Sequence, residues 1–315
     1  MAEYVFGIDV GGTTVKMGLF DISGTVIDKW EIPTRTENGG EKVLPDIADA
    51  ILAKMQEKGI AKEQVQGVGV GVPGPIDDAG MVHKAVNLGW GYFNLEETLS
   101  GLLDGITVKG GNDANVAALG EMWQGGGKGH TNLVAVTLGT GVGGGIIVNG
   151  KILTGSTGAG GEIGHIHVED NETEACGCGN YGCLEEYASA TGVVRLAKRA
   201  LAADTETPSV LRDGNVSAKT VFDAVKAGDA MAIRIAQQFG EYLGKGLAII
   251  AGVVNPEVFV IGGGVSKAGE VLFEYIRPSF DKTVFHGCKG AEFVLATLGN
   301  DAGIYGAAKL VLNED

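Results

Sequence analysis

Short apolar runs that end in glycine-rich turns recur along the chain. The run Tyr4 to Val10 is rich in β-branched and aromatic residues, ends in the letters DVGGTT and continues into the apolar run Val15 to Phe20. Such runs on either side of a glycine turn predict strand, turn and strand. The pattern returns from Leu133, where an apolar run ends in TLGTG at Thr137 to Gly141 and another run covers Gly145 to Val148. The sequence therefore predicts two similar hairpins.

The two hairpins align as Asp9-x-Gly11 with Thr137-x-Gly139, which indicates a weak internal repeat with one copy in each of two domains. The pair suits a nucleotide gripped from both sides, because glycine amides and hydroxyls can cradle phosphates while Asp9 faces their magnesium ion. A plain hairpin with a polar turn explains the first motif equally well when it is taken alone. The predicted nucleotide-binding residues are Asp9, Gly11, Gly12, Thr13 and Thr14, with Thr137, Gly139, Thr140 and Gly141 in the second hairpin.

The rest of the chain alternates helical and strand-like patterns, which predicts a mixed α/β protein. The predicted helices cover residues 41–58, 95–103, 114–123, 185–203, 218–226 and 230–252, with two more around 271–276 and from 300 to 312. The further predicted strands cover residues 64–72, 106–109, 258–261 and 293–296.

Asn112 and Asp113 stand where the strand predicted at 106–109 gives way, through Gly110 and Gly111, to a helix. One interpretation of Asp113 is a helix N-cap, which typically contributes about 1 kcal/mol. The other is a general base, because a carboxylate held at a strand end can take the proton of a substrate hydroxyl as its oxygen attacks phosphorus. The spacing fits both roles.

Another glycine-rich strand end is Gly262, Gly263 and Gly264, which follows the apolar run 258–261. Glycines there let the backbone approach a flat ring or a sugar closely, so these three are candidates for the adenosine end of a nucleotide. A glycine-rich turn between a strand and a helix explains the same letters equally well.

The segment from Gly161 to Glu186 gathers His165 and three of the four cysteines. An imidazole with three thiolates is the tetrahedral donor set that zinc prefers in closed structural sites. Buried cysteines beside an unrelated histidine are the weaker alternative. The predicted metal ligands are His165, Cys176, Cys178 and Cys183.

Glycines between these ligands support a metal knuckle. We expect Gly177, Gly179 and Gly182 to let the backbone turn tightly enough for the sulfurs to converge. A disulfide is the poorer interpretation, because three clustered cysteines leave one unpaired. Cys288 lies outside the cluster and is predicted to be incidental.

Composition sets the outer bounds. The 315 residues exceed one typical core and predict two domains. The formal charge of −15 disfavours nucleic acids and anionic membrane surfaces as partners. We found no apolar run near the roughly 20 residues of a membrane span. The few cysteines, with no secretory leader, indicate a reducing, cytoplasmic location.

The order of these motifs resembles the ROK family of sugar kinases, and within it the bacterial glucokinases. The resemblance covers nearly the whole chain, and its most specific part is the cysteine motif. Besides the elements above, it includes Pro73-Gly74-Pro75, Asn87-Leu88-Gly89-Trp90, Gly161-Glu162-x-Gly164-His165 and Cys176-x-Cys178-Gly179-x-x-Gly182-Cys183-x-Glu185.

The resemblance implies an α/β, actin-like ATPase (ribonuclease H-like) fold that is duplicated into two domains with an interdomain cleft for sugar and ATP. A smaller N-terminal domain would comprise residues 1–112 plus 300–315, to which the last helix returns, and a larger domain with the zinc knuckle would comprise residues 113–299. The implied activity is ATP-dependent phosphorylation of the 6-hydroxyl of D-glucose, with Mg²⁺ and a structural Zn²⁺, in a homodimer or homotetramer.

The resemblance also implies residue roles. Asp113 would be the general base and would also bind the sugar. The hexose hydroxyls would be bound by Asn87, Asn112, Asp113, Glu162, His165 and Glu185. These residue types suit the task, because sugar recognition needs fixed acceptors and amides, and a metal-bound imidazole can donate from its other nitrogen.

Three alternatives stay open at the level of the sequence. The first is a kinase of the same family for fructose, mannose or N-acetylmannosamine. The second is a sugar-sensing repressor, although the DNA-binding relatives carry an added segment and only eight residues precede Asp9 here. The third is a zinc-ribbon interaction module, which predicts a lost base or a damaged turn, whereas Asp113 and both turns are intact.

Overall fold

The computed structural model describes residues 2–312, and these fall into two compact units. The first unit contains the residues up to Gly129, Gly145–Gly161 and the residues from Leu298 onward, and the second contains His130–Gly144 and Glu162–Thr297. The predicted domain boundaries at 112/113 and 299/300 stay a prediction.

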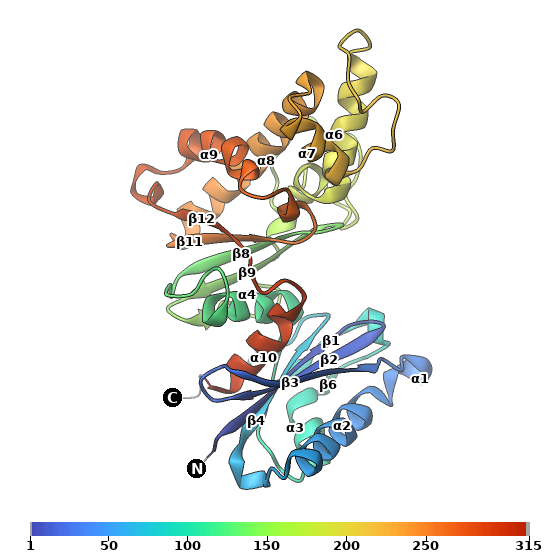
Figure 1. The fold of residues 1–315 in the computed structure, drawn as a ribbon, viewed down its shortest axis with the longest axis vertical. Helices are drawn as coiled ribbons and strands as arrows, with labels where there is room; N and C mark the ends of the chain where they lie inside the picture. The colour runs from blue at the N-terminus through green and yellow to red at the C-terminus, as the bar shows by residue number, and fades with distance from the viewer. Residues whose placement is uncertain (1, 313–315) are drawn as a thin grey trace. The chain divides into compact units, whose positions relative to one another are not determined.

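The first unit contains a mixed sheet with the strand order β3-β2-β1-β4-β7 (Figure 1). The strands β1, β2 and β3 form an antiparallel meander, whereas β4 pairs in parallel with β1, and β7 in parallel with β4. Their bounds are β1 (Tyr4–Val10), β2 (Thr14–Asp21), β3 (Val26–Pro33), β4 (Val65–Val72) and β7 (Val108–Asn112).

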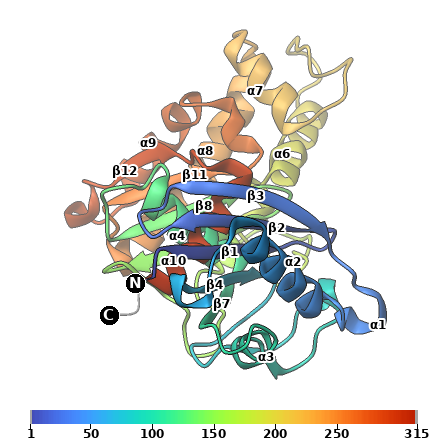
Figure 2. The ribbon, with the colours of Figure 1, turned by 60° about the horizontal axis from the view of Figure 1, so that its bottom comes forward.

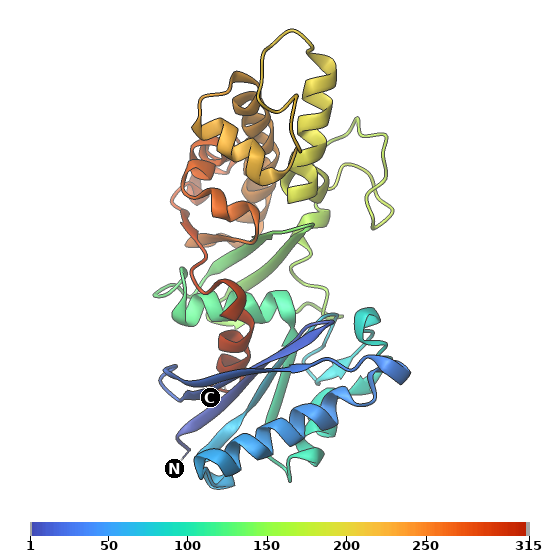
Figure 3. The same ribbon diagram turned by 45° about the vertical axis from the view of Figure 1, so that its right-hand side comes forward.

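Helix α2 (Val43–Lys58) covers one face of this sheet, as Figures 2 and 3 show. Ile47 and Ile51 are fully buried in one apolar core with Phe6 and Ile8 of β1. The helix supplies the crossover that a parallel β1 and β4 require. It ends at Gly59, whose φ of 67° is the left-handed conformation of a helix C-cap.

Helix α10 (Ala302–Leu312) packs on the first sheet and on α4 (Asp113–Gln124) at backbone distance. A Cβ on Gly7 would lie 1.9 Å from the carbonyl oxygen of Ile304, and a Cβ on Gly306 would lie 1.6 Å from that of Val116. Only glycine fits at both contacts. The C-terminal helix therefore belongs to the first unit.

The contact between α4 and α10 predicts a large stability effect. Gly306→Ala should lower the free energy of unfolding by roughly 1 to 3 kcal/mol, because an added methyl overpacks the crossing. Gly101 is the matched control, since it lies in helix α3 (Leu95–Leu102) with no atom within 4 Å of an added Cβ. Gly101→Ala should stabilise by roughly 0.5 to 1 kcal/mol. Equal urea midpoints for the two variants would contradict this packing.

The second sheet has the strand order β10-β9-β8-β11-β12, which repeats the arrangement of the first sheet strand for strand. β11 pairs in parallel with β8 and β12, as β4 does with β1 and β7 in the first sheet. The predicted internal repeat is confirmed, and Asp9 and Thr137 are each the second-to-last residue of the equivalent strands β1 and β8. The bounds are β8 (Leu133–Leu138), β9 (Val142–Val148), β10 (Lys151–Ile152), β11 (Val258–Gly262) and β12 (Glu292–Leu295).

Helices α8 and α9 lie side by side in the second unit (Figure 1). A Cβ on Gly240 of α8 would lie 2.2 Å from the carbonyl oxygen of Tyr275 of α9, so glycine sets their close approach. The helices of this unit are α5 (Glu185–Ala188), α6 (Ala190–Ala203), α7 (Ala218–Lys226), α8 (Ala230–Val254) and α9 (Val271–Thr283).

Shorter elements complete the described chain. They are α1 (Glu37–Gly40), η1 (Lys62–Gln64), β5 (Met81–Val82), η2 (Val86–Leu88), β6 (Phe93–Asn94), η3 (Ile163–His165), η4 (Val265–Ala268), η5 (His286–Cys288) and η6 (Gly299–Asp301). Within residues 2–312, none of the helices has both the length and the apolar character that crossing a membrane requires.

The strand predictions need correction at β7 and β3, and the two-residue strands β5, β6 and β10 were not predicted either. The strand expected at 106–109 is β7, which runs through Gly110 and Gly111, because pairing with β4 continues where the glycines indicated a turn. The strand β3 was not predicted. Its burial alternates along its length, and its polar letters fit a strand with one open face.

Candidate active site

Asp9 faces a lysine and a second carboxylate within the first unit. It pairs directly opposite Lys16 in the antiparallel register of β1 and β2. Burial raises the pKa of Asp9, the Lys16 ammonium opposes this rise and the Asp113 carboxylate adds to it. The start of α10 also closes on Asp9, since a Cβ on Gly303 would lie 2.6 Å from its Cγ. The carboxylates predicted to serve magnesium and proton transfer therefore act on each other electrostatically.

The first glycine turn is held firmly at its base and open at its tip. The Gly11 amide donates to the carbonyl of Thr14 at 3.0 Å, and the Thr34 hydroxyl donates to the carbonyl of Gly11 at 2.7 Å. Gly12 and Thr13 are exposed, and an added Cβ on Gly12 would meet nothing within 4 Å. A fixed turn with an open tip suits the predicted phosphate contact.

Asn112, and not Asp113, is the N-cap of α4. The Asn112 Oδ1 accepts from the amides of Ala114 at 3.1 Å and Asn115 at 3.2 Å, and its Nδ2 donates to the carbonyl of Gly74 at 3.3 Å. Asp113 is the first helical residue, and its Oδ1 accepts from the Ala114 amide at 2.8 Å. The carboxylate of Asp113 is therefore not needed to begin the helix, which weakens the interpretation of Asp113 as a cap.

Three of the sequence motifs meet in the first unit. Gly74 of the Pro-Gly-Pro segment has a φ of 136°, and an added Cβ would lie 2.6 Å from the carbonyl oxygen of Lys84. The segment after Lys84 carries Asn87, which is exposed on η2. Because Asn112 donates to the same Gly74, the structure brings the Pro-Gly-Pro segment, the Asn87 loop and the start of α4 together.

The hairpin of the second unit adjoins Glu185. The amide of Val142 donates to the Glu185 Oε2 at 3.0 Å, and a Cβ on Gly141 would lie 2.0 Å from the same oxygen. The start of α6 closes the other side, where the Thr191 hydroxyl donates to the carbonyl of Thr140 at 2.7 Å. A cavity of about 350 Å³ lies beside this hairpin, with Thr140, Gly141 and Glu185 among its lining residues.

The four predicted metal ligands converge in the second unit. One ligand atom from each of His165, Cys176, Cys178 and Cys183 lies within 4.8 Å of every other. The Cys178 and Cys183 sulfurs are 3.7 Å apart, and the Cys176 sulfur is 3.8 Å from the His165 Nδ1. Zn–S bonds of about 2.3 Å in a tetrahedron place two sulfurs about 3.8 Å apart, so this spacing fits zinc.

A second possible metal cluster shares one of these cysteines. Cys176, Glu185 and Glu186 also bring ligand atoms within 4.8 Å of one another. We favour the first cluster, because three sulfurs and one imidazole complete a tetrahedral set, whereas the second offers one sulfur and two carboxylates. The Cys176 sulfur lies 3.7 Å from the Glu185 Oε1, so Glu185 adjoins both the cysteines and the glycine hairpin.

The glycines of the knuckle differ in their roles. Gly179 and Gly182 have φ values of 91° and 68°, and an added Cβ on Gly182 would lie 2.0 Å from the carbonyl oxygen of Glu169. Gly177 shows no positive φ, and an added Cβ there would meet nothing within 4 Å. The expectation that Gly177 is needed for the turn is therefore wrong.

The sequence did not indicate the residue that anchors the knuckle. The side chain of Glu172 is 1% exposed and accepts from Arg199 Nη1 at 3.0 Å and from the Tyr187 hydroxyl at 2.5 Å. It also forms an ion pair with Arg195 Nη2 at 3.0 Å. The pKa of Glu172 is strongly lowered, chiefly by Arg199. This bond set ties the segment before Cys176 to α5 and α6. In the sequence, Glu172 appeared only as an acidic residue upstream of a predicted helix that carries arginines.

The triple glycine has a packing reason of its own. Gly263 has a φ of 86°, and an added Cβ would lie 2.6 Å from the carbonyl oxygen of Leu138, so β11 ends against β8. Gly262 closes β11, and Gly264 is exposed before η4. Contact with adenosine remains a prediction for these three residues.

Comparison with known proteins identifies relatives over the full length of the chain. A model of the ROK family matches residues 5–314. The chain is 45% identical to a glucokinase of Halalkalibacterium halodurans, and the match covers 99% of this chain and 96% of that protein.

Solved structures show the same fold. A ROK hexokinase from Thermus thermophilus has a TM-score of 0.79 at 33% identity, and the match covers 97% of this chain and 96% of that chain. A ROK family glucokinase from Streptomyces griseus, solved in complex with glucose and AMPPNP, has a TM-score of 0.70 at 36% identity with 98% of both chains covered. The duplicated sheets described above are those of the actin-like ATPase fold, and this chain belongs to the ROK family.

Proposed function

We propose that this protein is a cytoplasmic ATP-dependent glucokinase that transfers the γ-phosphoryl group of ATP to the 6-hydroxyl of D-glucose. The observation that carries the proposal is the 45% identity with a glucokinase over 99% of the chain. A glucokinase at 36% identity was solved with glucose and AMPPNP, the ligands that the proposed reaction calls for. We further propose a homodimer or homotetramer, which sedimentation can test.

Asp113 is the general base in this proposal. Its carboxylate lies at the start of α4, and the cap of this helix is made by Asn112, so Asp113 can accept a proton without loosening the helix. Asp113 lies close enough to Asp9 for the two carboxylates to act on each other electrostatically. The carboxylate takes the proton of the 6-hydroxyl as that oxygen attacks phosphorus, and ADP leaves.

The remaining predicted residues bind and orient the two substrates. Asp9 and the two glycine hairpins serve the magnesium-bound phosphates, and Mg²⁺ neutralises charge on the transferred group when bound. Zinc would be held by His165 and the three clustered cysteines, where it fixes the loop and leaves the other imidazole nitrogen for a hydroxyl. Glucose would be bound by Asn87, Asn112, Asp113, Glu162, His165 and Glu185. The adenosine end is assigned to Gly262, Gly263 and Gly264.

The activity test is hexose-dependent ADP release with glucose, mannose, fructose and N-acetylmannosamine under one set of conditions. Each misplaced hydroxyl leaves a buried partner unpaired at a cost of about 1 to 3 kcal/mol, so kcat/KM should fall roughly 10 to 100-fold per lost contact. Glucose should give the highest value. A competitor that exceeds glucose tenfold would overturn the substrate and leave the kinase assignment intact.

Asp9→Ala should separate the nucleotide contact from the sugar contact. Turnover should fall and the KM for ATP should rise, because the carboxylate that faces the magnesium shell is gone. Glucose affinity, measured by calorimetry without ATP, should stay close to that of the wild type. Asp9→Asn keeps the side-chain size opposite Lys16 and should show the same split, so a large loss of glucose affinity in both variants would contradict this role.

A further inference from the structure

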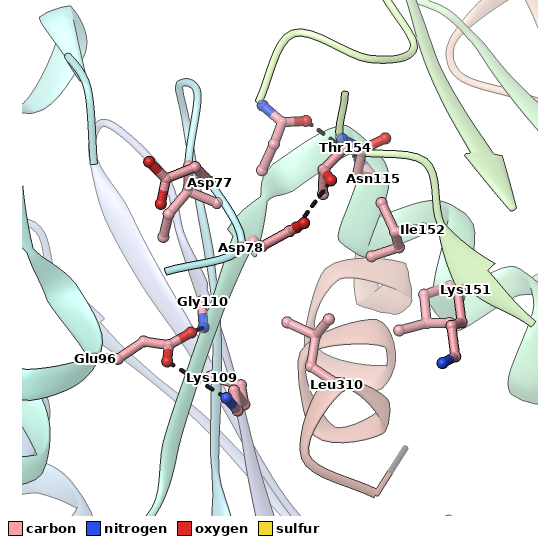
Figure 4. A pocket seen from close by; sticks show the side chains of 14 residues that line it. Asp77, Asp78, Glu96, Lys109, Gly110, Asn115, Lys151, Ile152, Thr154 and Leu310 are labelled. Carbon is pink, nitrogen blue, oxygen red and sulfur yellow. Dashed lines mark hydrogen bonds and ion pairs between the residues drawn. The ribbon is translucent and has the colours of Figure 1, made fainter. Parts of the chain in front are cut away.

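A cavity of about 430 Å³ lies in the first unit, at the edge of β7 (Figure 4). It falls within the range of about 300 to 1,000 Å³ that is typical of small-molecule sites. In Figure 4, Ile152 and Leu310 face the side that carries Asp77 and Asp78. The cavity therefore offers an apolar wall opposite polar groups, the combination that a sugar ring with its hydroxyls requires.

One buried acceptor in this cavity has no partner. Asn115 is 2% exposed and lines the cavity, and its Oδ1 lacks any hydrogen bond. Among the side chains of residues 2–312, the structure shows this state for only one other buried atom, the Nε of Arg195. A buried acceptor without a partner costs free energy unless a donor arrives. The Asn115 Oδ1 can therefore accept a hydrogen bond from a ligand O–H or N–H group.

The carboxylates around the cavity are already engaged. Asp78 accepts from the Thr154 hydroxyl at 2.9 Å, and Glu96 accepts from the Gly110 amide at 3.0 Å and pairs with Lys109 at 3.6 Å. Asp77 accepts from the amides of Ala79 and Met81 and contacts His83. Each carboxylate already has a hydrogen-bond or ion-pair partner, so a cationic amine would have to compete with these contacts.

Anionic ligands are disfavoured as well. The lining holds three carboxylates and two ammonium groups, so its net charge is negative and would repel a phosphate. β7 is the edge strand of its sheet, so its outer side carries backbone donors and acceptors without a strand partner, of which the Gly110 amide is used by Glu96. Hydroxyl groups can both donate and accept, which matches this mixture.

We propose that this cavity is a second, effector site that binds a neutral polyhydroxylated molecule of monosaccharide size. Its lining residues Lys151, Ile152 and Thr154 belong to the segment Gly145–Gly161, which continues into the second unit at both ends. Its lining also includes Asn112, which caps the helix that begins with Asp113. A ligand here braces both the connecting segment and the start of α4, and so acts on the catalytic carboxylate without touching it.

The test is equilibrium dialysis of labelled D-glucose against the whole chain without ATP, carried well beyond saturation of the first site. The wild type should bind a second, weaker equivalent. Ile152→Trp fills the cavity and should abolish this second equivalent while keeping the first. Leu153→Trp is the matched control, because Leu153 is the next residue, is 41% exposed and does not line the cavity. It should keep both equivalents.

Leu310→Trp fills the same cavity from α10 and provides an independent variant if Ile152→Trp does not fold. A single equivalent in the wild type means that the cavity holds water only, and it overturns the proposal. Loss of the first equivalent in a folded filled variant makes the cavity part of the substrate site and overturns it too. The proposed kinase activity is judged separately by ADP release, so either proposal can fail alone.

Discussion

Asp113→Asn is expected to lower kcat by at least about 100-fold while glucose affinity measured without ATP stays near that of the wild type. The amide keeps the shape of the side chain but cannot accept the proton of the attacking hydroxyl. The helix should survive, because Asn112 makes the N-cap bonds. The measurement is steady-state kcat together with a calorimetric glucose titration and a thermal unfolding curve.

The charge of Asp113 gives this experiment a second readout. Asp113 raises the pKa of Asp9, although burial is the larger cause. Asp113→Asn removes that negative charge, so the pKa of Asp9 should fall toward its ordinary value, which NMR titration can follow. Asp213→Asn is the matched control, since Asp213 is exposed, and it should change neither kcat nor the pKa of Asp9. Wild-type turnover in Asp113→Asn would remove Asp113 from the role of base.

Patterns that reflect local chemistry could be predicted from the sequence. The two hairpins follow from apolar runs around glycine turns, and their equivalence follows from the alignment of Asp9 with Thr137, which the two sheets confirm. The convergence of the four proposed metal ligands could be predicted because they lie within a short segment with a distinctive donor set. In each case the signal is a short motif that can be recognised without knowing how distant elements pack.

Features set by distant packing could not be predicted in this way. Gly110 and Gly111 indicated a turn, yet they continue β7 because β4 supplies the pairing partner from far along the chain. The Glu172 anchor depends on Arg195 and Arg199, which only the packing of α6 brings to it. Asn115 looked like an ordinary helix residue, and only the cavity around it shows that its acceptor is unpaired.

Cys178→Ser is expected to lower the metal content and the glucose affinity together. Elemental analysis should find about one zinc per chain in the wild type, because four converging ligands form one closed site. A serine hydroxyl does not ionise near neutral pH and so replaces the thiolate poorly. Cys178 is exposed, whereas Cys176 and Cys183 are buried, so its substitution disturbs packing least.

Glucose affinity should fall at least about 10-fold when the metal is lost. Mutation of the residues that surround a metal typically lowers affinity or activity 10 to 100-fold. His165 would lose its fixed orientation, and the Cys176 sulfur lies 3.7 Å from Glu185, so two proposed sugar contacts depend on the loop. Cys288→Ser is the matched control, since Cys288 lies outside the cluster on η5 and should keep both zinc and affinity. A metal-free wild type with full activity would leave the cysteines a purely structural cluster, and glucose binding would then rest on the carboxylates and amides alone.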